Sequence, residues 1–118
     1  MNKRPEYLAG STHKVHVSCG NLYVTVNKYE GKIIEVFATL GKGGSCTHCF
    51  CEFATRMLTL SLRAGVPIEQ VIKQGNGIQC PQPVMFPKES KVLSCPDAIV
   101  KVLLKEVNVV LENNEPKQ

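Results

Sequence analysis

Alternating apolar and polar residues mark the first part of the chain after a polar start. Three segments show this period of two, with apolar positions at Val15 and Val17, at Leu22, Val24 and Val26, and at Ile34, Val36, Ala38 and Leu40. Such alternation is typical of strands that bury one face. Turn residues separate the segments, with Cys19-Gly20-Asn21 after the first and Tyr29-Glu30-Gly31-Lys32 after the second. The pattern predicts an antiparallel meander of three strands that begins at Lys14.

The period becomes helical after Leu40. A first helix capped by Ser45 and ended near Gly65 is expected to bury Phe50, Phe53, Ala54, Met57 and Leu58. Pro67 suits the first turn of a second helix that ends at Gly75. Three prolines exclude regular pairing in residues 76–93, and Ser94-Cys95-Pro96-Asp97 opens a third helix as a capping pattern. We therefore expect an α+β fold with three helices packed on the sheet.

The boundaries of the domain follow from where these patterns stop. Residues 1–13 are polar and carry Pro5 and Gly10, so we expect a flexible N-terminal arm. Residues 14–112 form a single domain, and 113–118 form a frayed tail. A chain of 118 residues with 43% hydrophobic residues is long enough to bury one core.

Charge and hydropathy narrow the class of protein. Fourteen Lys and Arg against ten Asp and Glu give a net charge of +4. This charge favours anionic ligands, but it is much lower than that of a protein that coats nucleic acid. No apolar run approaches the ~20 residues of a membrane span, and the basic N-terminus continues into polar sequence rather than a signal peptide. We therefore expect a cytoplasmic protein with no membrane partner.

Six cysteines are the most informative residues of the chain. In a reducing cytoplasm such a set indicates metal binding or catalysis rather than disulfides. Four of them lie in turns or at helix starts, namely Cys19, Cys46, Cys80 and Cys95. Because the meander brings the first turn and the loop before Cys46 to the same end of the sheet, such positions can converge on one ion. Our preferred interpretation is a Cys₄ zinc site that joins these loops.

Two other interpretations of the cysteines stay open. Free cysteines often act as small buried hydrophobic residues. Cys46-Thr47-His48-Cys49 is also a C-x-x-C motif at a helix start, where thiol pKa values fall, so it suits a dithiol redox relay. His48 and Cys51 are alternative ligands, although we expect Cys49 and Cys51 to pack without binding metal.

A glycine-rich segment gives a second candidate site. Lys42, Gly43, Gly44 and Ser45 run directly into the start of a helix, where free N–H groups, a lysine and a hydroxyl suit a phosphate. The segment lacks the spacing of a Walker A loop. Its glycines are equally explained by the sharp turn from strand to helix. No catalytic set stands out, so we expect no enzyme activity from this chain alone.

The sequence resembles the TSCPD domain, found at the C-terminus of adenosylcobalamin (vitamin B12)-dependent ribonucleotide reductases. The matching strings span about residues 4 to 105 and include Cys19-Gly20-Asn21-Leu22-Tyr23-Val24-Thr25-Val26-Asn27, Leu60-Ser61-Leu62-Arg63-Ala64-Gly65-Val66-Pro67, Gly77-Ile78-Gln79-Cys80-Pro81 and Ser94-Cys95-Pro96-Asp97-Ala98-Ile99. The last string carries the family name, with Leu93 in place of its first residue. The resemblance implies four metal-binding cysteines at Cys19, Cys46, Cys80 and Cys95, and gives Cys49 and Cys51 no counterpart.

The resemblance also implies what the chain does not contain. A reductase barrel needs several hundred residues, a radical cysteine and a cobalamin site, so this chain cannot reduce ribonucleotides alone. The first hypothesis is a non-catalytic zinc-binding accessory domain that docks on a reductase catalytic chain. The alternatives are a stand-alone nucleotide-binding or phosphate-binding module and the dithiol relay. A homodimer is also expected, because a three-stranded sheet leaves edges to cover.

Overall fold

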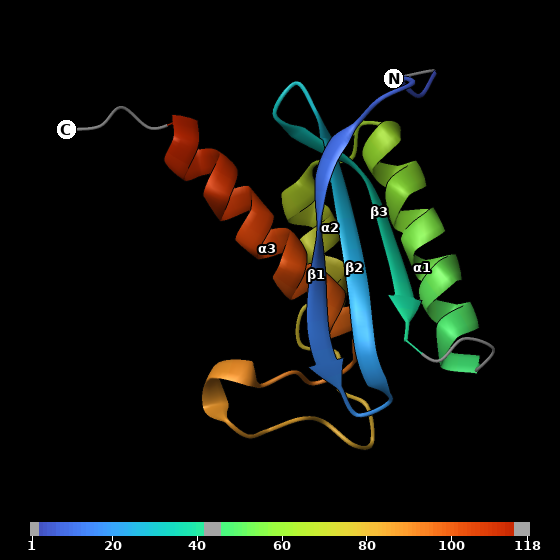
Figure 1. Cartoon of the computed structure of the whole chain (residues 1–118), viewed down its shortest axis with the longest axis vertical. Helices are drawn as coiled ribbons and strands as arrows, with labels where there is room; N and C mark the ends of the chain where they lie inside the picture. Colours follow the sequence, from blue (N-terminus) through green and yellow to red (C-terminus); the bar gives the residue numbers. More distant parts are fainter. Residues whose placement is uncertain (1–2, 42–45, 115–118) are drawn as a thin grey trace.

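Three antiparallel strands form one sheet in the order β1-β2-β3 (Figure 1). They are β1 (Ala9–Val17), β2 (Gly20–Tyr29) and β3 (Lys32–Leu40). The computed structural model describes residues 3–41 and 46–114, with side chains as far as residue 108. The turn between β2 and β3 has positive φ at Glu30 (51°) and Gly31 (78°), as a two-residue hairpin turn requires. The predicted meander is confirmed.

The first strand begins at Ala9, earlier than the start predicted at Lys14. Ala9 pairs with Lys28 in the register with β2, so residues 9–13, assigned above to a flexible arm, belong to the sheet. The alternation did not reveal this part of β1 because its inner face is polar. Ser11 and His13 both contact the carboxylate of Glu106 on α3 (Cys95–Asn114) rather than apolar side chains.

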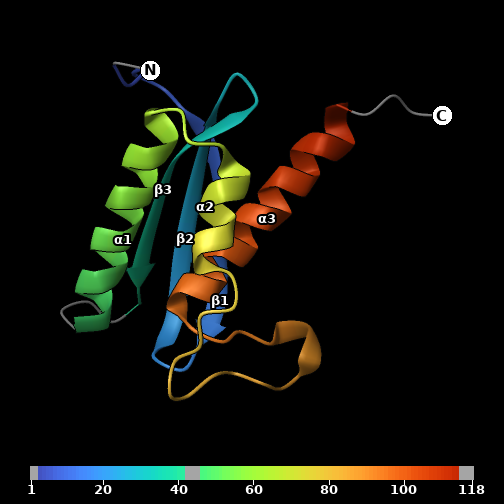
Figure 2. The same ribbon diagram turned by 180° about the vertical axis from the view of Figure 1, so that it is seen from behind.

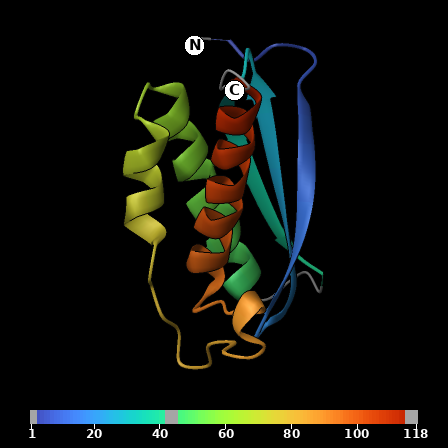
Figure 3. The ribbon, with the colours of Figure 1, turned by 90° about the vertical axis from the view of Figure 1, so that its left-hand side faces the viewer.

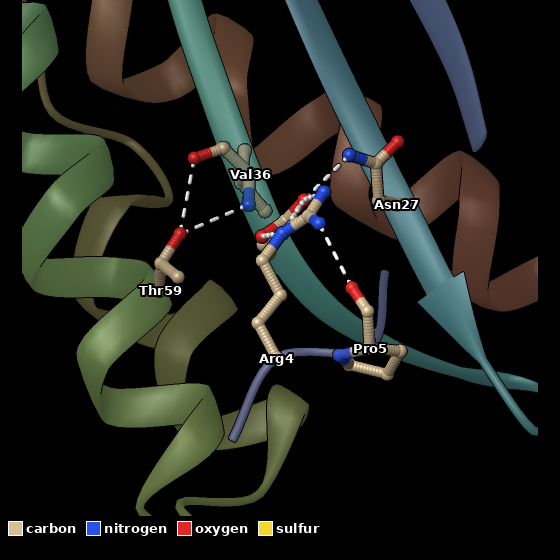
Figure 4. A network of polar contacts seen from close by, with 6 residues as sticks. Arg4, Pro5, Asn27, Val36 and Thr59 are labelled. Carbon is tan, nitrogen blue, oxygen red and sulfur yellow. Dashed lines mark hydrogen bonds and ion pairs between the residues drawn. The ribbon is translucent and has the colours of Figure 1, made fainter. Parts of the chain in front are cut away.

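The chain before β1 is held against the outer face of the sheet. Arg4 forms an ion pair of 2.9 Å with Glu35, which also accepts a hydrogen bond of 2.7 Å from Asn27 (Figure 4). Glu35 is only 2% exposed. The Arg4 guanidinium lowers the pKa of Glu35 against the opposing effect of burial, with further help from Asn27. Arg4 therefore anchors the N-terminal residues to β3.

All three helices lie on one face of the sheet (Figures 2 and 3). α1 (Cys46–Arg63) packs on β3, and α3 packs on β1 and β2, while α2 (Ile68–Gly75) packs on α3 and α1. The core between these layers is almost wholly aliphatic and centres on Leu22, Val24, Val26, Val36, Val102 and Leu103. The α+β class with three helices is confirmed. Among the described residues no helix has the length and apolarity to cross a bilayer.

The buried face of α1 differs from the prediction. Phe50, Phe53, Ala54 and Met57 are exposed, and α1 packs through Cys51, Thr55, Leu58 and Leu62 instead. Hydrogen bonding explains the choice of face. The Thr59 hydroxyl accepts a bond of 3.0 Å from the Val36 N–H and donates one of 3.1 Å to the Val36 carbonyl. Because β3 is an edge strand, α1 thus satisfies backbone groups that would otherwise stay unpaired.

The segment between α2 and α3 has little regular structure, as predicted from its prolines. It contains one short 3₁₀ turn, η1 (Lys88–Ser90), and a single bridge between Val84 and Val92. The part of this segment that leads back to α3 passes the β1–β2 turn. It lies at the same end of the molecule as the starts of α1 and α3 (Figures 1 and 3). α3 continues to Asn114, so Asn113 and Asn114, expected in the tail, are helical.

Candidate functional site

A cleft opens at the end of the molecule where these segments meet. It has a volume of about 590 Å³, and apolar atoms form most of its lining. Its walls come from four parts of the chain, namely the β1–β2 turn, the first half of α1, the loop near residue 80 and the start of α3. The side chains that matter chemically are Cys19, Cys51, Cys80 and Cys95.

Three of the four cysteines predicted as ligands therefore line one cavity. Cys19 lies in the β1–β2 turn, Cys80 in the loop after α2, and Cys95 at the first residue of α3. The fourth, Cys46, is exposed at the first residue of α1 and is not part of the cleft wall. Cys51 occupies the wall instead, one and a half helical turns further along α1.

Cys51 and Cys95 form a hydrogen-bonded pair of thiols. The Cys95 thiol lowers the pKa of Cys51, while burial and Cys19 oppose this effect. The same hydrogen bond raises the pKa of Cys95, and burial raises it further. The N-terminus of α3 would by itself lower the pKa of Cys95. The Cys95 thiol keeps its proton, however, because it donates that proton to the Cys51 sulfur.

The other two thiols contact hydroxyl groups rather than each other. Cys19 Sγ lies 3.8 Å from Thr47 Oγ1, and Cys80 Sγ lies 4.0 Å from Ser18 Oγ. These contacts place Cys19 beside the first turn of α1 and Cys80 beside the β1–β2 turn. Cys51 and Cys95 are thus paired, but among the described residues no three of the cleft thiols lie close enough to hold one ion.

The string Ser94-Cys95-Pro96-Asp97 forms the junction between the cleft and α3. Ser94 Oγ accepts the Asp97 N–H at 3.2 Å, which caps the helix as predicted, and donates to the Ile78 carbonyl at 2.6 Å. Asp97 is 1% exposed. Its carboxylate accepts the N–H groups of Gly77 at 3.1 Å and Leu93 at 3.0 Å.

The Asp97 carboxylate also forms an ion pair within α3. Lys101 Nζ lies 2.7 Å from the Asp97 carboxylate, one turn along α3. Burial raises the pKa of Asp97, but the hydrogen bond from Leu93, the ammonium of Lys101 and the Gly77 N–H outweigh it and lower the pKa. An ionised Asp97 therefore fastens both ends of the irregular segment to the start of α3, which sets Cys80 near Cys95.

Comparison with models of known families identifies the family of this chain. The family model of the TSCPD domain matches residues 1–107. The chain belongs to the TSCPD domain family. The resemblance to the C-terminal domain of adenosylcobalamin-dependent ribonucleotide reductases is the known context of this family. No curated protein and no solved structure matches the chain.

The residues of this TSCPD domain fit a zinc ion in their chemistry but not in their spacing. Four thiols are the donor set of a structural zinc site. Among the side chains that the structure describes, in residues 3–41 and 46–108, however, no three Cys, His, Asp or Glu side chains lie close enough to hold one ion. The structure therefore does not show the four-cysteine site predicted to join the loops: Cys46 is exposed and is not part of the cleft wall, and Cys19 and Cys80 contact hydroxyl groups.

The structure says less about the other residues that were predicted to form a site in this TSCPD domain. Lys42, Gly43, Gly44 and Ser45, and with them the predicted phosphate loop and the Ser45 cap, lie outside the described residues. Cys46 and Cys49 of the C-x-x-C motif are both exposed. His48 Nδ1 accepts a hydrogen bond of 3.4 Å from the Leu40 N–H at the end of β3.

Cys51 is the cleft residue that the preferred prediction left out. The sequence analysis named it as an alternative ligand but expected it to pack without binding metal. The signal that would have found it is helical spacing, since Cys51, Thr55, Leu58 and Leu62 lie on one face of α1. Choosing the more hydrophobic face, with its two phenylalanines, hid this alternative.

Proposed function

We propose that this TSCPD domain is a non-catalytic, zinc-binding accessory domain that docks on the catalytic chain of a ribonucleotide reductase. The observation that carries the proposal is the convergence of Cys19, Cys80 and Cys95 on one cleft from three separate segments. The family membership supplies the reductase context. A reductase barrel would have to lie outside this sequence, since the family domain accounts for residues 1–107 of 118.

Zinc would act structurally in such a site. Cys19, Cys80 and Cys95 would provide three thiolates, and the fourth would come from Cys46, as the family resemblance implies, or from Cys51, which lines the cleft. When bound, the ion would join the β1–β2 turn, the loop at Cys80 and the start of α3. Binding would have to draw together sulfurs that now contact hydroxyl groups.

Metal analysis of purified protein tests this proposal. About one zinc per chain is expected, and Cys95→Ser should lose it because it removes a thiolate common to both ligand sets. Cys49→Ser is the matched control, since Cys49 is exposed on the same helix as both candidates for the fourth ligand. Loss of zinc in Cys46→Ser or in Cys51→Ser distinguishes the two sets. Wild-type protein that stays free of metal after incubation with zinc would rule out the zinc site.

Docking needs a separate measurement. The domain should bind the purified catalytic chain of a reductase from the same cell, and zinc-free protein should bind more weakly if the ion orders the cleft. Absence of binding with zinc bound would reject the reductase partner while leaving the metal site intact. A phosphate or nucleotide ligand stays the alternative, and a thermal-shift panel tests it, since ligand at ~100 times its Kd stabilises by about 2.7 kcal/mol.

A further inference from the structure

Helix α1 is apolar on two opposite faces. Its inner face packs on β3 and the core, whereas large apolar side chains on its outer face are exposed. The exposed fractions are 73% for Phe50, 64% for Phe53, 47% for Met57 and 61% for Leu60. A helix with apolar residues on both sides is typical of one packed on both sides. Among the described residues nothing covers most of the outer face, which we call the α1 stripe, and Phe50 and Phe53 at its start also line the cleft.

The α1 stripe has the spacing of a helix-pairing surface. Phe50, Phe53, Met57 and Leu60 follow each other at intervals of three, four and three residues, and the exposed Ala64 continues the series. Residues at alternating intervals of three and four form the continuous seam along which two helices pack. From Phe50 to Leu60 the seam is about 15 Å long. Its length and spacing fit another helix of similar size.

We propose that α1 of a second copy of this chain covers the stripe, which makes the domain a two-fold symmetric dimer through antiparallel α1 helices. A two-fold axis between Phe53 and Met57 brings each of these residues opposite the other in the second copy. Phe50 then lies opposite Leu60 in the same way. Each large aromatic ring thus meets a smaller, flexible side chain, so the surface is complementary to itself, as a two-fold interface must be.

Charge on the flank of the stripe allows a second copy to approach. Glu52 and Arg56 form an ion pair of 2.9 Å within α1. Because Arg56, the cation beside the middle of the seam, is paired with an anion on its own helix, two copies meet there without like charges facing each other. A strongly basic or acidic flank would instead favour a partner of opposite charge.

The exposed area agrees with a small dimer. An aromatic side chain has about 150–250 Å² of surface, and aliphatic side chains have somewhat less. With the exposed fractions above, the four side chains present roughly 450 Å² per copy. Two copies would bury about 1,000 Å² including the adjoining residues, which is the lower limit for a specific interface. We therefore expect a dimer that forms at micromolar concentrations.

Sedimentation of the full chain at micromolar to millimolar concentrations tests the dimer. A reductant is included, because exposed Cys46 and Cys49 could otherwise form disulfides between copies. The expected mass rises to twice the 13.0 kDa of one chain. Leu60→Glu and, as a second variant, Met57→Glu should weaken dimerisation at least about tenfold. Phe86→Glu is the control, since Phe86 is 87% exposed on the irregular segment and should leave the dimer unchanged.

Two results would overturn the proposal. A wild-type chain that stays monomeric throughout this concentration range would exclude the dimer. A dimer that both α1 variants leave intact, with circular dichroism confirming their fold, would place the interface elsewhere. The zinc content of the same samples separates this proposal from the function proposed above, because the α1 variants change the mass and leave the metal-binding thiols in place.

Discussion

Glu106 gives the sharpest test of the packing between α3 and the sheet. It is 8% exposed, and its carboxylate contacts Ser11, His13 and Lys28, with Lys28 Nζ at 2.6 Å. Burial raises the pKa of Glu106, but the ammonium of Lys28 and the hydrogen bonds from Ser11 and His13 outweigh it and lower the pKa from 4.5 to about 2. The ionised carboxylate therefore stabilises the folded chain.

The free energy that ionised Glu106 contributes to folding follows from the size of its pKa shift. One unit of pKa corresponds to 1.36 kcal/mol, so ionised Glu106 contributes at most about 3 kcal/mol. Because the pKa is lower in the folded chain, this stability is fully present above about pH 4.5 and is lost as the pH falls towards about 2. Glu106→Gln mimics the protonated acid. It should cost about 3 kcal/mol at neutral pH and almost nothing near pH 2.

Urea unfolding of wild type and Glu106→Gln across this pH range measures the effect. The difference in free energy of unfolding should shrink as the pH falls, whatever the other carboxylates do, because both chains share them. Glu52→Gln is the control, since its exposed pair with Arg56 is worth only about 0.3–0.5 kcal/mol. Two curves separated by the same amount from pH 7 to pH 2 would refute the reasoning.

Three further substitutions probe other parts of the structure. Thr59→Val removes both hydrogen bonds to the backbone of Val36 and should cost about 1–3 kcal/mol in urea unfolding, whereas Thr59→Ser should cost less. Gly10→Ala should disrupt the start of β1, because a Cβ there would collide with the Val26 carbonyl, and faster amide exchange confined to this end would show it. Asp97→Asn should cost about 2–3 kcal/mol and speed alkylation of cleft thiols, and an unchanged alkylation rate would contradict the clamping role.

Local patterns predicted those strands whose inner face is apolar. In β2 and β3 the alternating apolar residues Leu22, Val24, Val26, Ile34, Val36, Ala38 and Leu40 are all buried, so the alternation alone located these two strands. The start of β1 was missed because its inner residues Ser11 and His13 meet Glu106, more than ninety positions later in the chain. A polar side chain that is buried by a distant carboxylate has no local signature.

The face of α1 shows a different limit of sequence reasoning. Both faces of this helix satisfy a helical period, and the outer one is the more hydrophobic. The sheet selects the inner face because Thr59 can complete the hydrogen bonding of the β3 edge, which a phenylalanine cannot do. The same error left Cys51 as an alternative ligand, so the preferred ligand set named three of the four cysteines in the cleft.

The signature string of the family explains the cleft without any metal. Ser94 caps α3, and the Asp97 carboxylate accepts the N–H groups of Gly77 and Leu93. Both side chains already have hydrogen-bond partners within the fold, so neither is free to act on a ligand. Their effect is to hold the loop that carries Cys80 beside the helix that begins with Cys95. These polar bonds fix the irregular segment to the start of α3 through side chains that are not thiols. The cysteines of the cleft are thus presented by the fold and left available for chemistry.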